Sequence, residues 1–156
     1  NGSAEEAIAK SIYTAAPDAL AFAENSDCDA LAVAIGTAHG VYAEKPKLDI
    51  ACLAEIAIAC KTPLVLHGGS GLSNDDFRGC VKNGISKINI FTDNNLTAAR
   101  AAVEHFNNKT GAFELMPYVT EAVKQATMER MRVFGSDGKA SCRNGGVSCG
   151  SGYLNH

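Results

Sequence analysis

The sequence contains no tryptophan and only four prolines, and aromatic residues make up 6% of its 156 residues. The longest apolar run, residues 30–35, has the length of a strand and falls far short of the roughly 18 residues that suggest a membrane-spanning helix. Neither sign of charge dominates, because the net charge is −3 and the Lys and Arg residues are scattered. The sequence therefore predicts neither a membrane protein nor a nucleic-acid-binding protein.

The composition is that of an ordinary globular chain, with 46% hydrophobic and 20% charged residues and a mass of 16.3 kDa. We expect one folded region over residues 1–140 and a tail rich in Gly, Ser and Cys over 141–156. The chain starts at Asn1, without Met or a charged-then-apolar leader. The expectation is that something was removed upstream or that the chain is a piece of a longer one.

Six cysteines are present, and an even number leaves a disulfide framework open. No CxxC motif occurs, and several cysteines lie in apolar stretches that suit buried thiols. We therefore expect a reduced, cytoplasmic protein. Whether Cys142 and Cys149, which bracket the Gly-rich tail, form a pair stays open. The six are Cys28, Cys52, Cys60, Cys80, Cys142 and Cys149.

Short apolar runs alternate with helical patterns along most of the chain. Strands are predicted over 29–35, 63–66 and 85–91, the first of them buried on both faces. Helices are predicted over 4–13, 17–25, 48–60, 73–83, 94–107 and 118–134, with Ser73 as an N-cap. This alternation is typical of an α/β fold with a parallel sheet. Both an open doubly wound sheet and part of a (β/α)8 TIM barrel fit it, but no GxGxxG supports a dinucleotide site, and a whole barrel needs about 250 residues.

Polar residues follow each predicted strand at its carboxyl end, where active sites of parallel α/β folds form. His39 follows the first strand, His67 the second, and Asn89 lies in the third. Each histidine alone is more often a hydrogen-bonded structural residue. Together they supply two of the three protein ligands that a catalytic zinc requires. Neither His105, on a late helix, nor His156, in the tail, is a natural third ligand.

The second strand runs into a glycine-rich turn, Gly68-Gly69-Ser70-Gly71, with a predicted helix after it. Exposed backbone N–H groups and a hydroxyl in such a turn favour phosphate binding, although a flexible turn is the simpler alternative. Barrels often bind phosphate with the loops after strands 7 and 8. If the second and third strands are those two, residues 68–70 and 89–92 share one phosphate.

Five segments stand out when they are taken in order: AIGTAHGVY (34–42), KPKLDI (45–50), PLVLHGGSGL (63–72), KINIFTD (87–93) and ERMRVFGSDGKA (129–140). Together they resemble the class II (zinc-dependent) fructose- and tagatose-bisphosphate aldolases. The resemblance runs from about residue 14 to 140 and implies a (β/α)8 barrel of which this chain holds approximately strands 6 to 8. The family's first zinc histidine and catalytic Asp, in an HxDH-like motif on an earlier strand, have no counterpart here.

The resemblance also implies a reaction and its site. These enzymes reversibly cleave a ketose bisphosphate into dihydroxyacetone phosphate and an aldehyde phosphate. His39 and His67 match two of the three zinc ligands, and Asn89 matches the catalytic Asn at the reacting end of the substrate. The residues that match the loops around the substrate phosphate and a monovalent cation (Na⁺ or K⁺) are Gly40, Gly68, Gly69, Ser70, Asn89, Ile90, Phe91 and Thr92.

Two positions depart from the fructose-specific pattern. Phe91 stands where those members usually have Asp, and Asn95 stands where they have an Arg that holds the distal phosphate; Arg100 comes later. The departures favour a different ketose phosphate as the substrate. The alternative is an inactive aldolase-derived subunit, which would be structural or would bind phosphosugars. Three barrel strands leave open edges, so we expect the missing N-terminal half-barrel or a partner chain to cover them, in a homo-oligomer.

Overall fold

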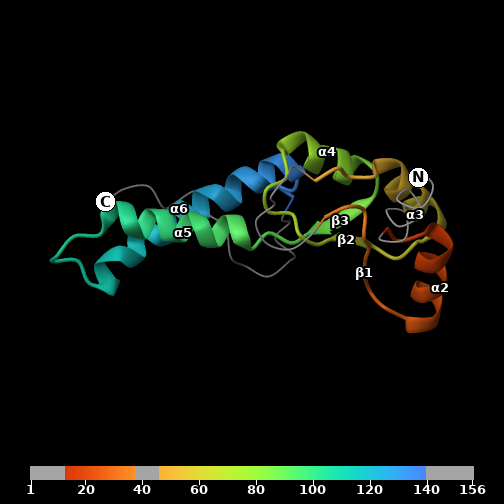
Figure 1. Cartoon of the computed structure of the whole chain (residues 1–156), viewed down its shortest axis with the longest axis horizontal. Helices are drawn as coiled ribbons and strands as arrows, with labels where there is room; N and C mark the ends of the chain where they lie inside the picture. The colour runs from red at the N-terminus through yellow and green to blue at the C-terminus, as the bar shows by residue number, and fades with distance from the viewer. Residues whose placement is uncertain (1–12, 38–45, 140–156) are drawn as a thin grey trace, which may run out of the picture.

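The computed structural model of the chain describes residues 13–37 and 46–139. A parallel three-stranded sheet, in the order β1-β2-β3, lies among the helices (Figure 1). The elements in chain order are α2 (Ala16–Ser26), β1 (Leu31–Ala32), α3 (Ile50–Ala59), β2 (Leu64–Leu66), α4 (Asn74–Lys82), β3 (Ile85–Ile88), α5 (Thr92–His105) and α6 (Ala112–Phe134). The predicted α/β class with a parallel sheet is confirmed, whereas residues 4–12 and the tail lie outside the described residues.

Most predicted helices form within about two residues of their expected ends, but the last begins earlier than expected. It starts at Ala112 rather than 118, and Pro117 lies inside its second turn. The Glu114 carboxylate accepts the Gly111 N–H at 3.0 Å and so caps this early start. Pro117 lies beyond the four N–H groups at the helix start that have no intrahelical partner, so it costs α6 one i→i−4 hydrogen bond, to the Phe113 carbonyl.

The strands are shorter than predicted, and the helices cover only one face of the sheet, although Val65 on the second face is also buried. Along the first strand segment Leu31, Val33 and Ile35 are buried, while Ala32 and Ala34 are exposed. The parallel register pairs Ala32 with Val65, and Val65 with Lys87, on that second face. The prediction that residues 29–35 are buried on both faces is therefore wrong for the described part of the chain, because its helices pack against one side only.

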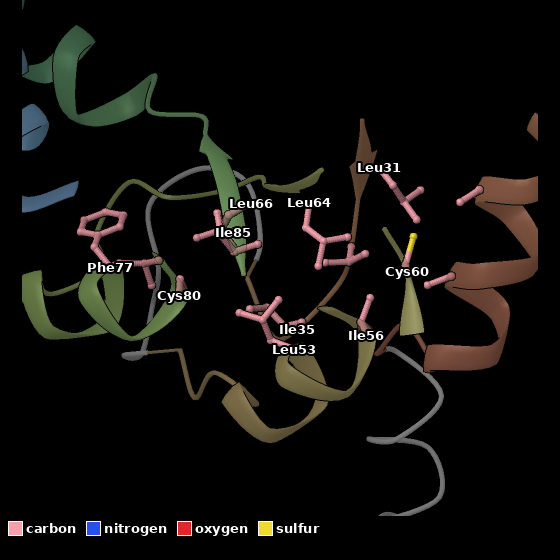
Figure 2. Close-up of a cluster of buried hydrophobic side chains, with 14 residues drawn as sticks. Leu31, Ile35, Leu53, Ile56, Cys60, Leu64, Leu66, Phe77, Cys80 and Ile85 are labelled. Carbon is pink, nitrogen blue, oxygen red and sulfur yellow. The ribbon is translucent and has the colours of Figure 1, made fainter. Parts of the chain in front are cut away.

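The core lies between the covered face of the sheet and helices α2, α3 and α4 (Figure 2). Leu64 and Leu66 of β2 point into it, as do Leu53 of α3 and Phe77 of α4. All four side chains are fully buried, and each stabilises the fold by about 2 kcal/mol through loss of contact with water. This packing holds the carboxyl ends of β2 and β3 in place.

The thiols in the described residues are free, as predicted: Cys28, Cys52, Cys60 and Cys80. Cys142 and Cys149 lie outside the described residues. No helix in residues 13–37 or 46–139 is long and apolar enough to cross a membrane.

Helices α5 and α6 form a hairpin that extends away from the sheet (Figure 1). None of the side chains of α6 is fully buried, and only Ala101 of α5 is. Phe134, near the end of α6, returns to the core and packs edge-on against Phe77, with 5.0 Å between ring centroids. The hairpin is thus anchored at its base and exposed along its length.

Candidate active site

A cleft of about 610 Å³ opens at the carboxyl ends of β2 and β3. Its lining comes from the segments that follow these two strands: His67, Gly68, Gly69, Ser70, Ile88, Asn89, Ile90, Phe91 and Thr92. The structure therefore brings together all the predicted site residues that it describes. His39 and Gly40 lie outside the described residues.

The glycine turn is held firmly against the end of β3. The Gly69 N–H donates to the Asn89 carbonyl oxygen at 3.2 Å. A Cβ on Gly69 would lie 3.0 Å from that oxygen and 3.1 Å from Ile88 Cγ2, so no larger residue fits without displacement. Gly68 and Gly71 have φ values of 65° and 86°, which favour glycine. The turn is a packed structure, and a merely flexible turn does not describe it.

Ser70 joins the turn to the start of α5. Its side chain is buried, at 6% exposure, and its Oγ accepts the Asp93 N–H at 3.1 Å. The hydroxyl keeps its own proton and can still donate it. The Gly71 N–H donates to Asp93 Oδ2 at 3.3 Å. Because α5 begins at Thr92, its positive helix end faces the same cleft as the glycine turn, an arrangement that suits an anion.

His67 and Asn89 meet across the two strand ends. The Asn89 Nδ2 atom lies 3.3 Å from His67 Nδ1 and 3.2 Å from Nε2, so the amide sits beside the imidazole ring. The His67 side chain is exposed and Asn89 is half-buried. This pair places an imidazole and an amide donor at one end of the cleft, next to the glycine turn.

Phe91 brings an apolar ring to the cleft, and it is 76% exposed. Asn95 is exposed on α5. None of the described residues that line the cleft carries a Lys or Arg side chain, and Arg100 is not among them. Anion binding by the described lining thus depends on hydroxyls, the helix end and backbone N–H groups other than those of Gly69 and Gly71, which already donate to Asn89 and Asp93.

A catalytic zinc takes three protein ligands, most often imidazole, thiolate or carboxylate groups. His67 carries an exposed imidazole, the kind of ligand that zinc prefers, and the ring contacts the Asn89 amide. In the part of the chain that the structure describes, no three His, Cys, Asp or Glu side chains come together. His67 therefore fits as one ligand of a zinc site whose other ligands come from elsewhere.

Two residues that no sequence pattern marked as functional support the site: Asp93 and Arg130. Arg130 Nη2 lies 3.6 Å from Asp93 Oδ2. Both residues stand in segments that carry the aldolase resemblance, which is the only sequence signal that could have drawn attention to them.

Comparison with known proteins decides the family. The family model "Fructose-bisphosphate aldolase class-II" matches residues 1–139. The chain belongs to the class-II fructose-bisphosphate aldolase family. Protein YdjI of Escherichia coli K12 is 43% identical over 136 residues, which are 87% of this chain and 48% of YdjI. A fructose-bisphosphate aldolase of Staphylococcus aureus (strain Mu50) is 32% identical over 143 residues, covering 89% of this chain and 50% of the relative.

Solved structures of this aldolase family resemble the chain as well. The crystal structure of the YdjI aldolase from E. coli K12 has a TM-score of 0.76 at 42% identity, covering 83% of this chain and 48% of that one. A putative fructose-1,6-bisphosphate aldolase from Coccidioides immitis has a TM-score of 0.75 at 26% identity, covering 81% and 45%. The chain thus spans about half the length of the curated relatives it matches.

Proposed function

We propose that this chain is the C-terminal half of a zinc-dependent aldolase that cleaves a ketose phosphate into dihydroxyacetone phosphate and an aldehyde. One observation carries the proposal: in a member of the class-II family, the His67 imidazole, the Asn89 amide and the Gly68–Ser70 turn line one cleft. The sheet is parallel, and the face opposite its helices would line a barrel interior, so we assign β1, β2 and β3 to approximately strands 6 to 8 of a (β/α)8 barrel.

The residues of this chain divide the work between binding and chemistry. The glycine turn, the Ser70 hydroxyl and the start of α5 bind the substrate phosphate, together with a monovalent cation (Na⁺ or K⁺), and fix the distance to the reacting carbons. The Asn89 amide donates a hydrogen bond to the oxygen on which negative charge develops as the carbon–carbon bond breaks. His67, with His39, would hold zinc. Zinc, when bound, polarises the carbonyl and hydroxyl oxygens of the substrate.

A second candidate function is a subunit that binds phosphosugars without turnover. Asn95 favours it, because it cannot hold a second phosphate in the way that an Arg side chain does, and Phe91 is a further departure from the fructose-specific pattern. In this case the phosphate turn still operates, but cleavage does not occur. Binding and turnover must therefore be measured separately.

The test supplies the missing half of the barrel. The chain is co-expressed with the half of E. coli YdjI that precedes the matched region, and the complex is assayed for zinc content and for cleavage of a panel of ketose mono- and bisphosphates. We expect about one zinc per complex and cleavage of at least one ketose phosphate. His67→Ala should remove the zinc, whereas Asn89→Ala should keep the zinc and lower kcat by about a hundredfold.

Arg78→Met, a surface change on α4, serves as the control and should alter neither quantity. A complex that binds inorganic phosphate, contains no zinc and cleaves no ketose phosphate would favour the binding subunit over the enzyme.

A further inference from the structure

We propose that Arg130 is a positioning residue for the phosphate turn, and that it acts by neutralising the Asp93 carboxylate beside that turn. The inference rests on the proposed function, because it takes the Gly68–Ser70 turn as the phosphate site. Arg130 does not line the cleft, so it is not a catalytic residue. It lies behind the turn, on α6, and reaches the turn through other side chains.

Arg130 has three partners on two other helices, α4 and α5. Its Nη1 donates to Asn74 Oδ1 at 2.8 Å, and its Nη2 lies 3.6 Å from Asp93 Oδ2. The guanidinium also stacks over Phe77, with Cζ 5.2 Å from the ring centroid. The Arg130 and Asp93 side chains are only 27% and 30% exposed, so solvent screens their attraction less than it would screen a surface pair.

These partners lie on both sides of the phosphate turn. Asp93 receives the Gly71 N–H on the same oxygen that faces Arg130, and its own N–H donates to Ser70 Oγ. Asn74 is the first residue of α4, which follows the turn in the chain. A single guanidinium therefore links the beginning of α4 to the beginning of α5, and the turn is held between them.

The charge of Asp93 explains why a cation is needed at this place. Its carboxylate contacts the backbone of the turn that would receive a phosphate, and two negative groups so close repel each other. The Arg130 guanidinium offsets that charge without entering the cleft. Removing only the cation should weaken phosphate binding, and removing only the carboxylate should strengthen it.

The experiment measures the dissociation constant of inorganic phosphate for the whole chain by calorimetry, in four forms at low ionic strength. Arg130→Met should bind phosphate about tenfold more weakly than the unsubstituted chain, and Asp93→Asn about threefold more tightly. The double variant should return close to the starting affinity, since Asn keeps an acceptor for the Gly71 N–H without the charge.

A purely structural role for Arg130 predicts the opposite ordering, in which each substitution weakens binding and the double variant is the weakest. Arg78→Met is the matched control, because it removes an Arg from an Arg–Asp pair on the exposed side of α4 and should not change the affinity. Circular dichroism verifies that each variant is folded. If Arg130→Met does not fold, Arg130→Gln takes its place in the same series.

The experiment distinguishes a failure of the proposed phosphate site from a failure of the proposed role of Arg130. An unsubstituted chain that binds no phosphate overturns both the proposed phosphate site and the role of Arg130. A chain that binds phosphate, but whose Arg130→Met and Asp93→Asn variants bind it unchanged or both bind it more weakly, overturns the role of Arg130 alone.

Discussion

Gly69 and Gly79 are ten positions apart in the chain, and their surroundings differ. Replacing each of them by alanine should therefore change the unfolding free energy in opposite directions. A Cβ on Gly69 would press within 3.0 Å of the Asn89 carbonyl oxygen, whereas a Cβ on Gly79, in the middle of α4, has no neighbour closer than Ile50 Cδ1 at 3.8 Å. We expect Gly69→Ala to cost about 1–3 kcal/mol of unfolding free energy and to weaken phosphate binding. Gly79→Ala should add up to about 1 kcal/mol, because alanine favours the helix.

Urea denaturation measures both changes on the same chain, so Gly79→Ala controls for any general effect of an added methyl group. Equal shifts of the two midpoints in the same direction would contradict the prediction.

Cys80 makes the stability of the fold depend on pH in the alkaline range. Burial, and secondarily the Asp76 carboxylate, raises the pKa of its thiol from the ordinary 9.0 to about 11. The folded chain therefore keeps a proton that the unfolded chain loses above pH 9. The unfolding free energy is unaffected by this group below pH 9 and falls by about 2–3 kcal/mol as pH rises to about 11.

Denaturation midpoints between pH 8 and 11 check this, with Cys80→Ala as the comparison. The variant should be less stable at pH 8 but should lose less stability on going to high pH. If both proteins lose stability in parallel, Cys80 does not cause the decline.

Much of the described site was predictable from individual residues. His67, the glycine turn and Asn89 stand directly at strand ends, and parallel strands bring such ends to one edge of the sheet. Asp93 and Arg130 were not predictable in this way. Their link joins positions 37 residues apart on two helices, and only the fold shows that their side chains meet.

At the scale of single elements, α4 offers a direct test of how the sequence begins a helix. The Ser73 Oγ accepts the Asp76 N–H at 3.2 Å, and Asp76 accepts the Ser73 N–H at 2.9 Å, which makes a capping box. Ser73→Ala should lower the unfolding free energy by about 1 kcal/mol. The measurement is chemical denaturation, with Ser86→Ala, at an exposed serine of β3, as the control.

A loss of the same size in both serine variants would show that the cap adds nothing specific. The cap was predictable because its signal is local: a serine, followed three residues later by an acid, before a helical pattern.

Element ends were harder to predict where the signal is not local. Residues 29–35 were expected to form a full strand, but pairing in the described chain reaches only from Leu31 to Ala32. Beyond Val33 the backbone turns to partners outside the sheet, because the Ala34 carbonyl accepts the Thr14 N–H at 2.8 Å and the Ile35 carbonyl accepts the Asp49 N–H at 2.9 Å. Sequence patterns report which residues prefer a strand, and they do not report where the partner strand ends.

At the scale of the whole molecule, the second face of the sheet and the α5–α6 hairpin both expose apolar residues, Ala32 and Ala34 on the sheet among them. In the proposed function, the second face of the sheet would line the interior of the barrel. The hairpin extends beyond the sheet, so barrel closure alone does not account for its outer surface (Figure 1). Val103 and Phe106 are exposed at the end of α5, and Phe113 and Met116 at the start of α6.

We propose that the expected homo-oligomer forms through this hairpin, with a second copy covering the exposed ring of Phe113, which is 89% exposed. A buried phenylalanine contributes about 2–3 kcal/mol, so Phe113→Glu should raise the dissociation constant of the oligomer by well over tenfold. Sedimentation velocity across a concentration series measures this. Ile58→Glu is the matched control, since Ile58 is 86% exposed on α3, away from the hairpin. If Ile58→Glu dissociates the oligomer and Phe113→Glu does not, the interface lies on the α3 side and the hairpin serves another purpose.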